Sequence, residues 1–516
     1  MNLLTPICAY YDMKGGYKVK LGYYSKRIIR SILSIVAIMV VIFTMVYSLV
    51  PRENIFFEDG TYAKLSAKPD DKYLYKMRTW QKLGYLDYYT LNDYCSSLYK
   101  VKSNEIVACN LAGSKEAKDF EKMYKDQGYT VEYLPISEAP VAHKDVPIVK
   151  RMVSWFSSII NIDHPWKIHD ENNPDLDRYI TVGLTESGGP AIKCSGCTHK
   201  YLLYTDTNFP FIHQNFIYFT LGNSYPTYSG FEVLDVILNS QGKDNKRWVT
   251  YETGIEGESA IIFGTLRYKP VLDKLDRNKF VDHYADYRTA KTTPSMMGTS
   301  FIMGILSLIL SYAIGLPVGL AMAKHKDGLV DKLGMVYIIF IIAVPSLAYI
   351  YLFRYLGAKI GLPSVFPTLG AGDVRSWILP VISLSLPSIS SLMLWTRRYV
   401  VDQMNSDYVK FAKAKGLNQS EIFKKHIFKN AIIPIAQGIP SSLAGCITGA
   451  IMTEAIYSVG GMGKMLPDGI KQYNNAMIVA LSFLFSTISV VSVLLGDVVL
   501  IKIDPRIQLQ EKEGRS

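Results

Sequence analysis

The chain has 516 residues, of which 49% are hydrophobic and 20% are charged, and its formal net charge is +11. This length exceeds one ordinary domain, and the composition suits a protein that is partly embedded in a membrane and partly exposed to water. A positive charge of this size can indicate nucleic-acid binding. Much of it, however, lies beside apolar stretches, where a basic bias on the cytoplasmic side is the simpler explanation. We therefore expect no nucleic-acid partner.

The chain starts with a basic lead followed by an apolar stretch. Residues 1–27 are polar and carry several lysines, and residues 28–50 are apolar. At about 1.5 Å per residue, this stretch can cross a bilayer core of about 30 Å. No small-residue cleavage site follows it, so we predict a retained transmembrane helix with a cytoplasmic N-terminus.

The following segment, of about 240 residues, has a different composition. The segment 51–292 has no apolar run long enough to span a membrane and is rich in Tyr, Asp, Lys and Asn. Strand-like pieces at 177–184 and 260–263 and a helical pattern at 114–127 predict an α+β domain. Its length allows a core of its own. We expect it outside the membrane, between the first and second transmembrane helices.

Four cysteines lie in this domain, and an extracellular location would allow them to form disulfides. They are Cys95, Cys109, Cys194 and Cys197. No second CxxC motif and no suitably spaced histidine pair accompanies Cys194 and Cys197, which argues against zinc. We expect structural disulfides and no metal, and the pairing stays open, either within the CxxC motif or from it to the other two.

The remaining chain contains five further apolar segments. We predict transmembrane helices at about 299–323, 333–354, 376–396, 431–457 and 476–501. Pro345 is expected to kink the third helix. Residues 293–503 then form the membrane core, with a tail at 504–516. The fold class predicted is a polytopic α-helical membrane protein with six transmembrane helices and both termini cytoplasmic.

The segment 431–457 is unusually rich in polar and small residues for a membrane helix. Such a helix could line a water-filled path. It could equally pack closely against other helices. The residues proposed to line the path are Gln437, Ser441, Gly445, Thr448 and Glu454, together with Pro345 from the third helix.

The loop 397–430 is basic, which favours a cytoplasmic location. Tyr408, Phe411, Ala412 and Lys415 recur at helical spacing, and Gly416 can end a helix at little steric cost. The pattern predicts a helix–glycine–helix hairpin that could dock into a groove on a soluble partner. A solvated basic loop that only orients the protein is the alternative.

Residues 408–417, followed by His426, Asn430, Ala431 and Pro434, resemble the cytoplasmic coupling loop of ABC-importer permeases, closest to the oligopeptide/dipeptide/nickel branch. Residues 410–412 depart from the Glu-Ala-Ala of the wider superfamily. The resemblance implies that an ATPase subunit binds this loop. The coupling residues that it implies are Tyr408, Ala412, Ala414, Lys415, Gly416, Leu417 and Pro434.

Other segments are similar to the same branch. Residues 313–323 resemble its second helix, and residues 504–507 resemble its C-terminal end. Residues 453–463 resemble the end of the fifth helix and the re-entrant segment that closes the outer gate, which adds Gly461 and Gly463 to the expected gate. The resemblance implies the type I ABC-importer permease fold. The long inserted domain resembles the enlarged outer loop of some Gram-positive peptide permeases.

The resemblance also implies partners. Ser458 stands where a phosphate-binding loop ending at Lys464 would need glycine, so we find no ATP site and expect no cofactor on this chain. ATP and Mg would bind two separate ATPase subunits. The other expected partners are a homologous second permease subunit, an extracellular peptide-binding lipoprotein, the peptide substrate and the lipid of a bacterial plasma membrane.

Several alternatives stay open. Oligopeptides are the preferred substrate, but a dipeptide, a pheromone peptide, nickel or an oligosaccharide is possible. A membrane enzyme using Cys194 and Cys197, or acting by hydrolysis in the outer domain, is a second class. A signal transducer that transports nothing is a third. The inserted domain could dock the binding protein or act as a lid on the outer gate.

Overall fold

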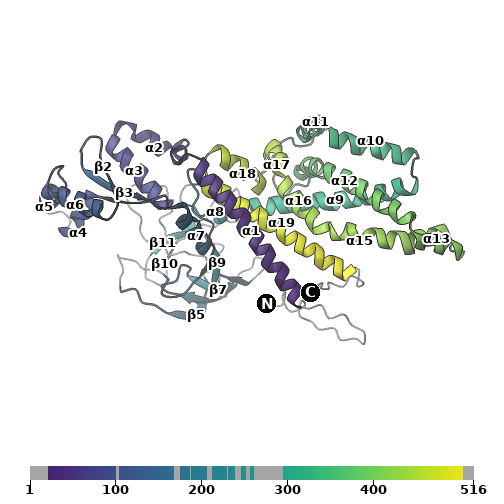
Figure 1. The fold of residues 1–516 in the computed structure, drawn as a ribbon, viewed down its shortest axis with the longest axis horizontal. Coiled ribbons are helices and arrows are strands. Elements are labelled where there is room, and N and C mark those ends of the chain that lie inside the picture. Colours follow the sequence, from purple (N-terminus) through teal and green to yellow (C-terminus); the bar gives the residue numbers. More distant parts are fainter. Residues whose placement is uncertain are drawn as a thin grey trace, which may run out of the picture. The chain divides into compact units, whose positions relative to one another are not determined.

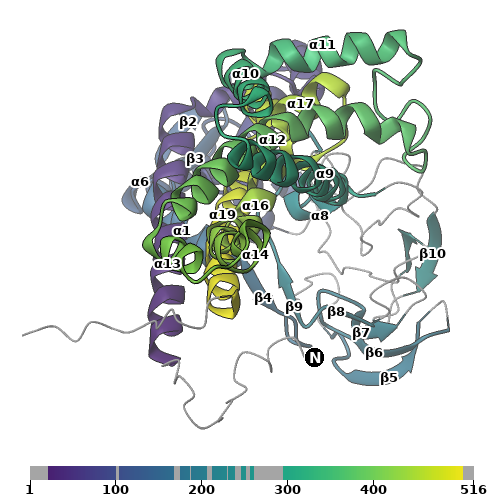
Figure 2. The same ribbon diagram turned by 90° about the vertical axis from the view of Figure 1, so that its right-hand side faces the viewer.

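The structure is a computed structural model that describes residues 21–99, 104–167, 175–185, 188–205, 212–228, 231–238, 246–250, 256–260 and 294–503. The chain divides into two compact units (Figures 1 and 2). We call residues 1–39, 299–464 and 483–516 the membrane unit, and residues 40–298 and 465–482 the inserted unit. The helices α1, α9, α18 and α19 each cross a boundary between the two.

The membrane unit is helical. Its elements, including those shared with the inserted unit, are α1 (Leu21–Leu49), α9 (Met296–Lys324), α10 (Leu329–Ala343), α11 (Ser346–Lys359), α12 (Arg375–Met404), α13 (Asp407–Ala414), α14 (Gln419–Ile422), the π-helix η4 (Phe423–Phe428), α15 (Lys429–Gln437), α16 (Ile439–Gly449), α17 (Ile451–Tyr457), α18 (Met462–Lys471) and α19 (Asn475–Ile503). Among the described residues, four helices are long and apolar enough to cross a membrane, and two bent helix pairs raise the number to six if each pair is one span. The predicted fold class of a multi-pass helical membrane protein is confirmed.

The third predicted span is broken rather than kinked. Instead of one helix over 333–354, α10 and α11 meet at 109°. Val344 has an extended backbone, with φ −88° and ψ 128°. The ring of Pro345 disfavours the helical conformation in the residue before it, so α10 has to end at Ala343. Pro345 itself is exposed at this corner.

The fifth predicted span, 431–457, is also not one helix. It is divided among α15, α16 and α17, and the helical stretch Gln419–Gln437 meets α16 at 42°. Pro440 lies in the first turn of α16, where its missing N–H is tolerated. The loop predicted at 397–430 starts later than expected because α12 continues to Met404.

The membrane unit has an apolar core to which α9, α11, α12 and α17 contribute. Met303, Tyr349, Leu384 and Tyr457 are among its buried members. A polar pair lies within it: the hydroxyls of Tyr457 and Ser383 are 2.9 Å apart. At the other side of the unit, Arg27 of α1 forms an ion pair with Asp497 of α19.

The inserted unit is α+β. Its further elements are η2 (Arg52–Phe56), α2 (Gly60–Lys64), η3 (Leu65–Ala67), α3 (Pro69–Lys82), β1 (Leu86–Thr90), α4 (Leu91–Leu98), α5 (Asn104–Cys109), α6 (Lys115–Asp126), β2 (Thr130–Tyr133), β3 (Pro140–Asp145), α7 (Ile148–Ser158), β4 (Ile160–Ile162), β5 (Ile180–Leu184), β6 (Pro190–Cys194), β7 (Tyr201–Thr205), β8 (Ile212–Gln214), β9 (Ile217–Phe219), α8 (Val233–Leu238), β10 (Lys246–Thr250) and β11 (Glu256–Ala260). The helix predicted at 114–127 is α6, with Ser114 as its N-cap. Residues 261–263, where a strand was expected, lie outside the described residues.

All strand pairs in the described part of this unit are antiparallel. They form a three-stranded sheet in the order β1-β3-β2, a four-stranded sheet β5-β6-β7-β8, and the two-stranded pairs β4-β9 and β10-β11. Helices α4 and α6 pack near the first sheet around Phe120 and Ala142. The cysteines pair as Cys95–Cys109, which joins α4 to α5, and Cys194–Cys197.

Asp59 connects distant parts of the inserted unit. It is 5% exposed and caps α2 by accepting from the N–H groups of Thr61 and Tyr62 at 2.9 and 3.2 Å. It also accepts hydrogen bonds from the hydroxyls of Tyr75 and Tyr225. Burial raises the pKa of Tyr225, so its hydroxyl remains a donor to the carboxylate. One buried acid thus holds the segment after α1, helix α3 and residue 225 together.

Candidate functional site

The short helix α13 has one face packed into the membrane unit. Val409 and Ala412 are buried in an apolar cluster with Val400 of α12 and Ile427 of η4. Tyr408 is half-buried at its edge and donates a hydrogen bond of 2.6 Å to the side-chain oxygen of Gln403. The packing fixes the orientation of α13 relative to the helices on both sides of it in the chain.

A Schellman motif ends α13. The N–H of Gly416 donates to the carbonyl of Lys413 at 3.0 Å, and the N–H of Leu417 donates to the carbonyl of Ala412 at 3.3 Å. Gly416 has φ +77°, a left-handed conformation that glycine adopts without steric cost. The turn reverses the chain and directs Leu417 back onto the apolar cluster.

The opposite face of α13 is open. Ala414, Lys415 and Gly416 are exposed there, and the side chain of Phe411 is 69% exposed. A large aromatic surrounded by small and basic residues is suited to insertion into a groove of a partner protein. Phe411 was not among the predicted coupling residues. Its position in the helical repeat, next to the buried Ala412, is the signal that could have identified it.

The second half of the hairpin starts at a side-chain cap. The side-chain oxygen of Asn418 accepts from the N–H of Glu421 at 2.8 Å, and Glu421 pairs with Lys425 one turn later at 2.7 Å. The following π-helix η4 buries Ile427 and leads into α15, where Pro434 is half-buried. π-Helical turns are frequent at functional sites.

An ion pair braces the helix that carries α13. Arg397 of α12 donates two hydrogen bonds to Asp331 of α10, at 2.5 and 2.7 Å. Asp331 is 3% exposed and also accepts from the N–H of Asp327 at 2.9 Å. Two parallel bonds between a guanidinium and a carboxylate fix geometry as well as adding energy. The last turns of α12 are therefore held rigidly where they meet the coupling hairpin.

Helix α16 has one face of small, open residues. Ser441, Gly445 and Gly449 follow each other at four-residue spacing and are exposed. A β-carbon added at either glycine would touch nothing within 4 Å. The opposite face is buried through Ala444 and Ile447. Of the proposed path residues, Ser441 and Gly445 lie on this face, and Gly449 extends it beyond those predicted. Gln437 does not lie on it, because it is half-buried at the end of α15, on the other side of the 42° bend.

Glu454 lies apart from this open face. Its carboxylate is fully buried and accepts hydrogen bonds from the hydroxyl of Ser300 at 2.6 Å and from the N–H of Lys464 at 2.8 Å. A β-carbon added at Gly461 would collide with the same carboxylate, and one added at Gly463 would lie in tight contact with it, at 3.0 Å. Glu454 therefore holds the segment 458–464 in place. Ser300 was missed in the sequence, since no local pattern links residues 154 positions apart.

Thr448 and Pro345 complete the predicted path residues. Thr448 is half-buried, and its hydroxyl donates to the carbonyl of Ala444 at 3.0 Å in its own helix. Pro345 lies at the corner between α10 and α11. Within the described residues, no group of three or more His, Cys, Asp or Glu side chains is arranged to hold a metal ion.

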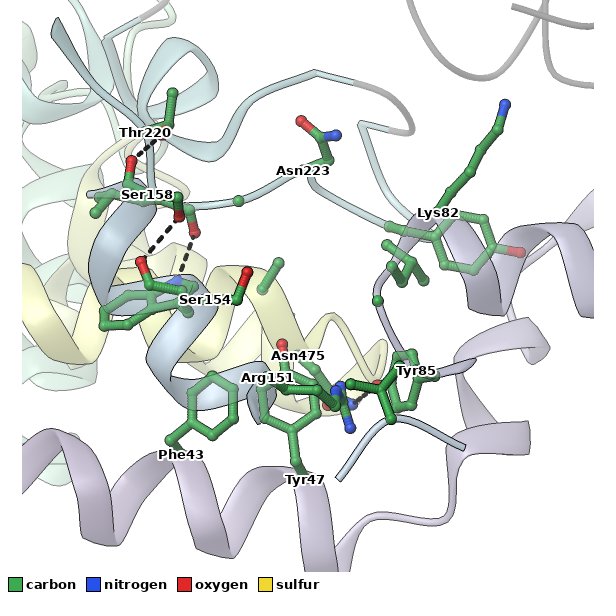
Figure 3. A pocket seen from close by; sticks show the side chains of 18 of the residues that line it. Phe43, Tyr47, Lys82, Tyr85, Arg151, Ser154, Ser158, Thr220, Asn223 and Asn475 are labelled. Atoms are coloured by element: carbon green, nitrogen blue, oxygen red, sulfur yellow. Dashed lines mark hydrogen bonds between the residues drawn. The ribbon is translucent and has the colours of Figure 1, made fainter. Parts of the chain in front are cut away.

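The inserted unit contains a cavity of about 500 Å³ (Figure 3). The guanidinium of Arg151 lies over the rings of both Tyr47 and Tyr85, 4.2 and 3.9 Å from their centroids. Asn475 donates a hydrogen bond of 2.8 Å to the Tyr85 hydroxyl. The lining comes from segments far apart in the sequence, including α1, α7 and the start of α19, so no sequence motif identifies it.

Residues 315–509 match the family described as binding-protein-dependent transport system inner membrane component. The chain is 38% identical over 501 residues to the oligopeptide transport system permease protein AmiC of Streptococcus pneumoniae, covering 96% of this chain and 99% of that protein. It is 28% identical over 277 residues to the dipeptide transport system permease protein DppB of Lactococcus lactis, covering 54% and 86%. A structure of the MetNI methionine ABC transporter in inward-facing conformations superposes with a TM-score of 0.34 at 14% identity, covering 40% and 93%.

Proposed function

The chain belongs to the oligopeptide-type family of ABC-importer permeases, and on this premise we propose that it moves oligopeptides across a bacterial plasma membrane as one of two homologous permease subunits. An extracellular peptide-binding lipoprotein delivers the substrate. Two ATPase subunits, which bind ATP and Mg²⁺, supply the energy. The basic character of the loop supports a cytoplasmic location for α13 and both termini, and with it an extracellular location for the inserted unit.

The observation that carries the proposal is the construction of α13. One face is fixed in an apolar cluster with α12 and η4, and the other presents Phe411 and basic residues to solvent. A helix built in this way can receive a push or pull from a bound motor and pass it to α12, which Arg397 ties to Asp331 of α10. Coupling requires that nucleotide and peptide bias the same pair of conformations.

The peptide path is proposed to follow the open face of α16. Ser441, Gly445 and Gly449 leave room along this helix, and small residues place few specific demands on a passing chain. Selectivity would then reside mainly in the binding protein. The segment 458–464, held by Glu454, is the proposed outer gate, and the inserted unit is the proposed docking site for the binding protein.

The proposal is tested by reconstituting the complete complex in vesicles with the binding protein. We expect ATP-dependent accumulation of labelled oligopeptides inside the vesicles, and less accumulation of dipeptides. ATP turnover without accumulation of any solute would instead identify a signal transducer. Accumulation of nickel or an oligosaccharide would replace the proposed substrate and leave the permease role in place.

Docking at α13 has its own test. An aromatic anchor at the centre of an interface contributes about 2 kcal/mol or more, roughly a 30-fold change in affinity. We expect Phe411→Ala to weaken binding of the ATPase subunits to the permease by about this factor. Lys413→Ala, at another exposed position of α13, is the matched control. Equal affinities of the two variants would contradict the role of Phe411.

A further inference from the structure

Helix α7 runs antiparallel along the C-terminal end of α1. The guanidinium of Arg151 lies over the ring of Tyr47, and four residues later the ring of Trp155 lies 6.2 Å from that of Phe43. A step of four residues forward in α7 thus corresponds to a step of four residues backward in α1, as the labelled side chains in Figure 3 also indicate. The C-terminal end of α7 therefore points back along the membrane helix.

The direction of α7 determines how deep its C-terminal end lies relative to the membrane surface. Residues 25–49 of α1 form a candidate span with strong apolar character, and Pro51 follows its end. Phe43 lies six residues before Leu49, about 9 Å along the axis at about 1.5 Å per residue. Amphipathic elements at membrane surfaces are buried by about 5–10 Å. Taking Leu49, the end of this candidate span, as level with the membrane surface, we infer that Trp155 lies at the depth of the lipid headgroup and acyl boundary. The residues that follow α7 then begin at this depth.

The element that follows α7 is the two-stranded ribbon of β4 and β9. It is attached to the end of the helix by a hydrogen bond from the N–H of Thr220 to the carbonyl of Ile159 at 3.1 Å. The indole N–H of Trp155 also donates to the carbonyl of Leu221 at 3.3 Å, just beyond β9. These bonds fix the ribbon at the membrane-directed end of α7.

The ribbon exposes its apolar side chains and turns its polar ones inward, the reverse of a ribbon on the surface of a soluble protein. Side chains alternate between the two faces of a strand. In the register observed, Ile160 pairs with Phe219 and Ile162 with Ile217, so these four share one face. They are 46–64% exposed.

The polar residues of the ribbon lie on the inward face. Asn161 donates to the carbonyl of Ser158 at 2.6 Å and to the hydroxyl of Thr220 at 2.9 Å. The hydroxyl of Tyr218 lies 3.2 Å from that of Thr198, and its ring contacts the buried His199. The ribbon thus directs its polar groups into the protein and its apolar groups outward, as expected of a surface that faces lipid.

The residues after β4 have the composition of a membrane interface. Trp166 is 67% exposed, and the ammonium of Lys167 lies 3.4 Å from the side-chain oxygen of Asn161 on the ribbon. Tryptophan and lysine are typical of the headgroup level, where an aromatic ring and a long cationic side chain can both be accommodated.

We propose that the β4–β9 ribbon is an interfacial membrane anchor, with Ile160, Ile162, Ile217 and Phe219 inserted among phospholipid chains of the leaflet at the C-terminal end of α1. The anchor would hold the inserted unit at the membrane surface in addition to its covalent connections. This role is independent of the transported substrate and of which side of the membrane the unit occupies.

The test uses the complete transporter complex in phospholipid nanodiscs. Ile162→Cys is labelled with an environment-sensitive fluorophore in a background that also carries Cys8→Ser and Cys446→Ser, and Ile136→Cys is the matched control. Ile136 lies between β2 and β3 in the same unit and is 68% exposed, compared with 64% for Ile162. We expect a blue-shifted emission at Ile162 that is quenched by lipids with a spin label near the headgroup, and neither effect at Ile136.

The proposal is overturned if the probe at Ile162 emits as in water, or if both positions are quenched to the same extent. A blue shift that appears only when the binding protein is added, without quenching by spin-labelled lipid, would also overturn it. That result would assign the ribbon to a protein interface. Quenching at Ile162 alone, before the binding protein is added, supports insertion into lipid.

Discussion

The hydroxyl of Ser300 in α9 donates a hydrogen bond of 2.6 Å to the carboxylate of Glu454 in α17. The same hydroxyl oxygen accepts a hydrogen bond from the N–H of Met462 at 2.8 Å. Two side chains thus connect the second long helix of the chain to residues 462–464, at the C-terminal end of the segment 458–464. Because this segment is the proposed outer gate, the position of the gate depends on a carboxylate that is buried away from the open face of α16.

Replacing Glu454 by alanine should release this segment. The hydroxyl of Ser300 and the N–H of Lys464 would lose their acceptor in a buried site, and each unsatisfied group costs about 1–3 kcal/mol. We expect a lower midpoint of thermal unfolding of the complex and reduced peptide uptake in vesicles. Thr448→Ala is the control for the unfolding midpoint, because the Thr448 hydroxyl donates to a carbonyl of its own helix. Equal midpoints for the two variants would refute the role of Glu454.

A second prediction compares two glycines, Gly461 beside the proposed gate and Gly445 on the proposed path, for which opposite effects of alanine are expected. A β-carbon at Gly461 would collide with the Glu454 carboxylate, whereas one at Gly445 would meet nothing within 4 Å. Overpacking of this kind costs about 1–3 kcal/mol. We therefore expect Gly461→Ala to lower stability and uptake together, and Gly445→Ala to leave the unfolding midpoint unchanged. Thermal unfolding of both variants in detergent checks the prediction, which fails if Gly445→Ala is the less stable of the two.

The end of α13 provides a third prediction. Gly416 has φ +77° and open space around it, so only the backbone conformation opposes a side chain there. A left-handed conformation costs an ordinary L-residue about 1–2 kcal/mol, and asparagine tolerates it better than most. We expect Gly416→Val to reduce peptide uptake per ATP hydrolysed, and Gly416→Asn to retain most of it. The two rates are measured in the same vesicles, and identical ratios for valine and asparagine would exclude a conformational role.

The sequence predicts the membrane segments well because a span needs a long apolar run, and local composition is sufficient to find it. It predicts their bends poorly. Pro345 indicates a disturbance, but no local pattern gives the angle of 109° between α10 and α11. The end of α12 at Met404 also lies beyond the boundary that the arginines at 397 and 398 suggested, because charged residues can continue a helix past the apolar run.

The candidate site likewise has features that local sequence predicts and features that only the fold brings together. The coupling hairpin could be predicted from residues 408–417 because its turn is a local motif with a glycine in a required conformation. The partners of Glu454 and of Asp331 could not, because Ser300 and Arg397 are brought to them only by the fold. The disulfides could be predicted in part. The sequence indicates which four cysteines form them, but the pairing depends on how α4 and α5 pack.

The two disulfides of the inserted unit should differ in how much they stabilise it. Cys95 and Cys109 are 14 residues apart and join two helices, while Cys194 and Cys197 are three apart in one turn. In the chain-entropy description, closing the longer loop contributes about 3 kcal/mol and the shorter about 2 kcal/mol. We expect the double alanine variant at 95 and 109 to make the inserted unit of the complete transporter more sensitive to protease than the double variant at 194 and 197. Peptide uptake should persist in the second variant, and its abolition without loss of protease resistance would favour thiol chemistry at that pair.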